Sequence, residues 1–127
     1  MGIQDGRDYL VLAQDDLQAA RLLFQTATQY HNACFHAQWA AEKALKAVLL
    51  ADGVHFPKAH DIEFLIDLVR KKRPELPTFV EAAAVLDQYN SDARYKRKFR
   101  DEIESDEADA AIAYAQVILA ACKEFVQ

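Results

Sequence analysis

The chain has 127 residues, of which 52% are hydrophobic, with only three glycines, three prolines and a formal net charge of −5 at pH 7. This length predicts one domain, residues 1–127, with a core of its own, and the composition excludes a disordered protein. No apolar run approaches the length of a membrane span and the first residues contain no signal-peptide core, so we expect a cytoplasmic protein without membrane contact. Cys34 and Cys122 lie in apolar helical runs, which is typical of reduced core thiols.

Apolar residues recur with the 3.6-residue period of an α-helix along the chain. The pattern predicts helices over about 6–28, 31–52, 61–72, 79–93 and 105 to near the end. Gly53 ends the second helix, and Pro74 and Pro77 prevent the third from continuing. Thr78 and Glu81 have the spacing of a capping box for the fourth. No segment alternates with the period of two that strands require, so we expect an all-α, up-and-down bundle of about five helices, four of them forming the core.

Basic residues are concentrated in two short segments, RKKR at 70–73 and RYKRKFR at 94–100. These hold four and five of the fifteen basic residues and no acidic residue, which is typical of a surface that meets an anionic partner. RKKR has a simpler interpretation, because positive charge is favourable at a helix C-terminus. Short connections predict antiparallel neighbours, so that His60 and the 94–100 segment share one pole with the N-termini of helices 1, 3 and 5. RKKR is then expected at the other pole.

The segment 31–52 is apolar on nearly every side yet carries polar groups. These groups and one aromatic residue are His36, Gln38, Trp39, Glu42, Lys43 and Lys46. Glu42 and Lys46 have the spacing of an intrahelical ion pair, and Gln38 lies one turn earlier, which predicts a polar ladder reaching another helix or a second subunit. His36, Trp39 and Lys43 form either a partly exposed edge or a groove where the indole stacks on a base and Lys43 and Lys46 contact phosphate. Because a monomer core would leave these groups unsatisfied, we favour a subunit interface or a nucleotide or RNA groove.

His60, at the start of the third helix, either caps that helix or acts on a ligand by binding an anion or transferring a proton. Arg94 and Tyr95 follow the fourth helix, where a guanidinium group suits phosphate and an adjacent ring can support it. Together with Lys96 and Arg97 they complete the candidate phosphate-binding residues. The histidine and cysteine spacings fit no zinc site, and phosphate-loop, nucleophile-elbow and dinucleotide motifs are absent, so we expect no metal or cofactor.

Three segments occur in order: HNACFHAQWAAEKALKAVLLADG at 31–53, AHDIEFLIDL at 59–68 and LDQYNSDARY at 86–95. With the acidic start of the last helix, they resemble the HEPN domain family of small prokaryotic helical proteins, and the resemblance covers nearly the whole chain. It implies a homodimeric helical bundle that binds nucleotide or RNA. It also implies a partner, a minimal nucleotidyltransferase, and a setting in toxin–antitoxin systems.

One branch of that family comprises metal-independent ribonucleases that use an arginine and a histidine separated by four to six residues. No arginine precedes a histidine at that spacing in this chain, whose last histidine is His60. The resemblance therefore favours a nucleotide- or RNA-binding module that acts with a nucleotidyltransferase and is not a self-sufficient enzyme. The alternatives are a ribonuclease toxin that uses His60 and Arg94, and a purely structural partner protein.

Overall fold

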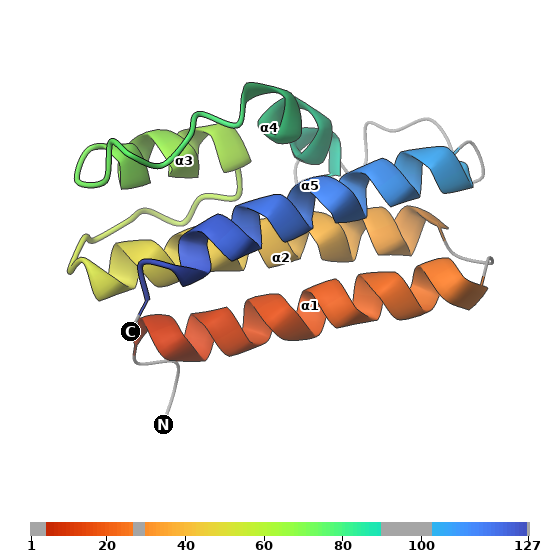
Figure 1. The fold of residues 1–127 in the computed structure, drawn as a ribbon, viewed down its shortest axis with the longest axis horizontal. Coiled ribbons are helices and arrows are strands. Elements are labelled where there is room, and N and C mark those ends of the chain that lie inside the picture. The colour runs from red at the N-terminus through yellow and green to blue at the C-terminus, as the bar shows by residue number, and fades with distance from the viewer. Residues whose placement is uncertain (1–4, 27–29, 90–102, 127) are drawn as a thin grey trace.

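The computed structural model describes residues 5–26, 30–89 and 103–126. Its elements are α1 (Gly6–Thr26), α2 (Tyr30–Ala51), α3 (Ile62–Arg70), α4 (Val80–Leu86), the short 3₁₀ helix η1 (Asp87–Tyr89) and α5 (Ser105–Lys123). Helices α1, α2 and α5 lie side by side, and α3 and α4 lie above them in Figure 1. The predicted all-α bundle is confirmed.

Helix α2 is the centre of the bundle, because 14 of its 22 residues are buried against other parts of the same chain. Small residues permit this close packing. At Gly6 of α1, an added Cβ would lie 2.4 Å from the Ala47 carbonyl oxygen of α2. The apolar surface of α2 is therefore covered within one chain. A second copy is thus not needed to cover this apolar surface.

The predicted end of the second helix at Gly53 agrees with the structure. Helix α2 ends at Ala51, and Gly53 has a positive φ of 69°, a conformation that favours glycine. The Val54 N–H donates to the Leu49 carbonyl at 2.8 Å and the Gly53 N–H to the Leu50 carbonyl at 3.1 Å, the two bonds of a Schellman motif.

The capping box predicted for the fourth helix was wrong. Its N-cap residue is Phe79, in a left-handed conformation with φ 47°, and no side chain caps the helix. The left-handed residue starts the helix one position later than the Thr78 pattern requires. Helix α4 then covers only 80–86 before η1, and the predicted remainder from residue 90 lies outside the described residues.

The predicted poles were also wrong in part. The segment 52–61 does not turn tightly but runs back along α2, so that His60 reaches Glu42, ten residues before Asp52. Ten extended residues can span about 33 Å, ample for this return. Helix α3 therefore starts beside the middle of α2, and α5 starts at the end opposite the start of α1 and runs parallel to α2 (Figure 1).

The RKKR segment lies at the pole where α1 begins and α2 ends, and not at the opposite pole as predicted. The Arg73 guanidinium forms a bidentate ion pair with Asp52, at 3.0 and 2.7 Å, and lies 4.9 Å from the centre of the Phe125 ring. Lys72 donates to the Asp52 carbonyl at 3.2 Å. Positive charge beside a helix C-terminus is favourable, and RKKR lies beside two of them. Arg70 is in the last turn of α3, as the sequence predicted, and Lys72 and Arg73 contact the end of α2.

Candidate functional site

Six residues of α2 form a stripe on one side of the helix, called here the polar stripe: His36, Gln38, Trp39, Glu42, Lys43 and Lys46. It lies between α1 on one edge and the returning segment 52–61 on the other. Helix geometry puts its members within one side of α2, with Trp39 near the middle. Trp39 is only partly buried, whereas Gln38, Glu42 and Lys46 are buried. The stripe is therefore a shallow surface over polar groups that the rest of the chain holds in position.

Asp16 of α1 organises the first edge of the stripe. Its buried carboxylate is 3.0 Å from His36 Nδ1 and accepts a hydrogen bond from Lys43 Nζ at 2.5 Å. The His36 ring lies edge-on to the Trp39 ring, with 5.0 Å between their centres. Sequence reasoning missed Asp16, although its position one turn after Leu12 and Ala13 put a carboxylate within the apolar face of the first helix.

Glu42 organises the second edge. The predicted ion pair is present, because Lys46 Nζ donates to its carboxylate at 2.9 Å, and His60 Nδ1 lies 3.2 Å from both carboxylate oxygens. Lys46 also lies 5.6 Å from the centre of the Phe56 ring. Only 6% of Glu42 and 8% of Lys46 is exposed, so this is a buried pair and not a solvated one.

The polar ladder reaches the segment before α3 of the same chain. Gln38 Nε2 donates to the His60 carbonyl at 2.8 Å, one turn from the contact between Glu42 and the His60 ring. Most of these polar groups are therefore satisfied within one chain, contrary to the sequence-based expectation. Gln38 Oε1 is the exception: it is the one buried side-chain oxygen or nitrogen without a partner among the residues that the structure describes.

Two similar clusters thus flank Trp39. In each, one buried carboxylate holds one histidine through Nδ1 and one lysine through Nζ: Asp16 with His36 and Lys43, and Glu42 with His60 and Lys46. The carboxylates compensate the charges of both lysines. Neither histidine has a hydrogen bond at Nε2 to a described residue, so this atom can accept from a ligand when the ring is neutral or donate when it is protonated.

The start of α3, just after His60, is held by a residue of η1. Ile62 N–H and Glu63 N–H donate to the Asp87 carboxylate of η1, at 2.7 and 3.2 Å, so Asp87 caps α3 from a distant part of the chain. Burial raises the pKa of Asp87, although these two bonds act in the opposite direction. His60 itself contributes no side-chain cap; its ring is directed to Glu42.

Tyr89 ends η1 inside the core. Its hydroxyl donates to the Glu107 carboxylate in the first turn of α5, and its ring packs edge-on against Phe35 with centres 6.2 Å apart. Burial, followed by the bond to Glu107, raises the pKa of Tyr89 far above its ordinary value. The chain is thus anchored five residues before the predicted phosphate contacts. Those contacts, Arg94, Tyr95, Lys96 and Arg97, lie outside the described residues.

Among the residues that the structure describes, no group of three or more His, Cys, Asp or Glu side chains is arranged to hold a metal ion. Cys34 and Cys122 are both reduced and buried, and burial raises the pKa of Cys122 to about 12. None of the helices in the part that the structure describes is long and apolar enough to cross a membrane.

Comparison with known proteins identifies relatives along nearly the whole chain. The sequence model of the HEPN domain matches residues 7–125. A solved structure described as ST0689, an archaeal HEPN homologue, is similar with a TM-score of 0.81 and 26% identity, over 98% of this chain and 100% of that one. TT1696 from Thermus thermophilus is similar with a TM-score of 0.80 and 33% identity, over the same shares.

A curated relative from Methanocaldococcus jannaschii, named "Putative toxin MJ1304", is 38% identical over 48 residues. The match covers 38% of this chain and 31% of that protein, so it spans about a third of the relative's length.

Proposed function

Because this chain belongs to the HEPN domain family, we propose that it is a homodimeric module that binds a nucleotide or single-stranded RNA. In the proposal it acts with a minimal nucleotidyltransferase, in a toxin–antitoxin pair. The observation that carries the binding proposal is the pair of clusters around Trp39. Two carboxylates hold His36 and His60 by Nδ1, so each ring is oriented before any ligand arrives.

The stripe suits a ligand with a flat base and a phosphate. A partly exposed indole offers a stacking face, which is worth about 1–3 kcal/mol per base. Lys43 and Lys46 are already paired with carboxylates, so most of the charge for phosphate has to come from elsewhere. The basic segment 94–100 is the natural source, because it begins five residues after Tyr89. Asp87, two residues before Tyr89, contacts the start of α3 next to His60.

Binding is tested by fluorescence anisotropy with labelled single-stranded RNA at two salt concentrations. We expect affinity to fall steeply with salt, because phosphate contacts release counterions. Trp39→Ala should weaken binding roughly tenfold, the equivalent of about 1.4 kcal/mol for one stacked base. Phe64→Ala, which removes an exposed aromatic residue on α3, is the matched control and should leave binding unchanged.

The basic segment is tested in the same titration. Arg94→Ala should cost more than Lys96→Ala, because a bidentate guanidinium contact exceeds a mobile point charge. The control is Lys71→Glu, a charge reversal within RKKR. Lys71 is preferred to Lys72 and Arg73, because those two side chains bind Asp52 at the end of α2 and their loss would disturb the fold. Equal losses from Arg94→Ala and Lys71→Glu would indicate diffuse electrostatics. No binding at all would favour the purely structural partner protein.

The toxin–antitoxin setting is supported by the name of the partial relative from Methanocaldococcus jannaschii. If the partner proposal is correct, the tagged chain purified from its native cells should retain a small nucleotidyltransferase, and co-expression of the two should relieve any growth arrest that this chain causes alone. Purification without such a protein would contradict the partner assignment while leaving RNA binding open.

A second candidate, a metal-independent ribonuclease, is favoured by the geometry of His60. Its ring is partly exposed, with Nδ1 against the buried Glu42 carboxylate, which is the arrangement of an oriented acid or base. The missing arginine–histidine spacing argues against it. We expect the purified chain in EDTA to leave single-stranded RNA intact. Cleavage that disappears in His60→Ala and Arg94→Ala would promote this candidate above binding alone.

A further inference from the structure

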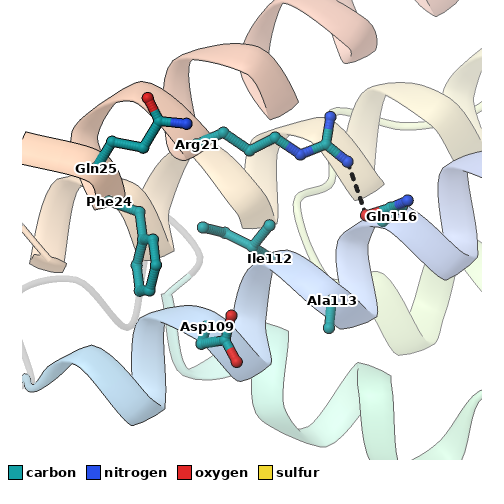
Figure 2. A pocket seen from close by; sticks show the side chains of 7 residues that line it. All are labelled: Arg21, Phe24, Gln25, Asp109, Ile112, Ala113 and Gln116. Carbon is teal, nitrogen blue, oxygen red and sulfur yellow. Dashed lines mark hydrogen bonds between the residues drawn. The ribbon is translucent and has the colours of Figure 1, made fainter.

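The seam between α1 and α5 carries two adjoining surface hollows. Figure 2 shows the first, of about 260 Å³, in which Arg21 of α1 reaches across to Gln116 of α5. Arg21 Nη2 donates to Gln116 Oε1 at 2.7 Å, and this bond separates the first hollow from a second of about 250 Å³ farther along the same helices. The surface along the contact of α1 and α5 therefore has one hollow on each side of Gln116.

A row of exposed residues follows α5 along this seam. Its members are Asp109, Ala113, Gln116, Ala120 and Lys123. Their alternating spacing of four and three residues keeps them within an arc of about 80° on the helix, the pattern by which one helix packs along another. Two members are alanines, which permit axes about 8 Å apart, and Val117 beside the row is 53% exposed.

The charges of the row are complementary to themselves. Asp109 and Lys123 each lie seven residues from Gln116, about 10.5 Å along the axis in opposite directions. Neither forms an ion pair with a described residue. When two such helices lie antiparallel about a two-fold axis at Gln116, Asp109 of each copy lies opposite Lys123 of the other. The first hollow of one copy then faces the second hollow of its mate.

We propose that this row on α5 is the surface on which a second copy of the chain docks, with the two α5 helices antiparallel at a shallow crossing angle. A shallow angle follows from the heptad spacing, and it keeps both terminal charge pairs within reach. The inference rests on the homodimer of the proposed function and assigns the face that forms it. An isologous contact of this kind closes after two copies.

The experiment measures molar mass by size exclusion with light scattering, and the dissociation constant by sedimentation, at micromolar concentration. Ala113→Arg puts a long charged side chain into the small row and should give a monomer. The matched control is Ala84→Arg, at an exposed alanine on α4, which should remain dimeric. Circular dichroism should report unchanged helix content in both variants, because both positions face solvent in one chain.

A charge exchange tests the antiparallel arrangement. Asp109→Lys and Lys123→Asp should each weaken the dimer roughly tenfold or more by opposing like charges, and the double variant should restore it. A dimeric wild type that is unaffected by Ala113→Arg would overturn this face but not the homodimer. Single charge reversals without rescue would overturn the antiparallel arrangement. A monomeric wild type would overturn the homodimer, whereas RNA binding is measured separately through Trp39.

Discussion

Replacing Glu42 with alanine is expected to destabilise the fold strongly. The variant leaves Lys46, 8% exposed, without its carboxylate, with the Phe56 ring as its remaining favourable neighbour. Removing one partner of a buried ion pair typically costs about 3–5 kcal/mol. For a domain of this size, we expect the melting temperature to fall by roughly 10–20 °C.

The assay is urea unfolding followed by circular dichroism, with thermal unfolding as a second measurement. Asp16→Ala is the control, because the side chain of Lys43 is 31% exposed, against 10% for Lys46, and can return to water. It should cost about 1–2 kcal/mol. The double variant Glu42→Met with Lys46→Met should recover most of the loss, since two apolar residues need no partners. A loss for Glu42→Ala no larger than that for Asp16→Ala would refute the reasoning.

Three further results are expected. Gly6→Ala should destabilise by about 1 kcal/mol in thermal unfolding, because the clash with the Ala47 carbonyl outweighs a gain in helix propensity of about 1 kcal/mol. As the pH falls from neutral to 3.8, the free energy of unfolding of the wild type should rise relative to that of Asp87→Asn. The raised pKa of Asp87 means that the folded chain takes up this proton first; a difference independent of pH in urea titrations would contradict it. Cys34 and Cys122 should resist a thiol reagent at pH 8 until the protein is unfolded, as both are buried and burial raises the pKa of Cys122 to about 12; rapid labelling of the native chain would be the opposite result.

Helix positions were predictable because they depend on neighbours along the chain. The expected ranges 31–52 and 61–72 differ from α2 and α3 by at most two residues at each end, and 6–28 begins where α1 begins. Its expected end at residue 28 lies outside the described residues. Periodicity, Gly53 and the prolines are local signals. The predicted start of the fourth helix was wrong, also for a local reason. Phe79 adopts a left-handed conformation that the capping-box pattern does not anticipate.

The sequence indicated the polar residues of α2 and His60, but it missed Asp16 and most of the contacts among these side chains. The Glu42–Lys46 pair follows from spacing on one helix, so sequence alone suggested it. The partners of His36 and His60 did not follow, because Asp16 is 20 positions from the first and Glu42 is 18 from the second. Such pairs depend on how α1 and the returning segment pack on α2.

The sequence by itself determined an all-α chain, the bounds of its second and third helices and a polar stripe on an otherwise apolar helix, since these depend on period and residue type within a few turns. Only the tertiary structure decided that the stripe consists of two carboxylate-centred clusters around Trp39, and that RKKR closes the end of α2. The physical reason is how α1 packs on α2, which sets the Asp16 cluster, and the path of 52–61, which sets the Glu42 cluster. A connection of this length can turn at once or run back along its helix. Here it runs back along α2, because that path buries its contacts, and no local sequence pattern encodes those contacts.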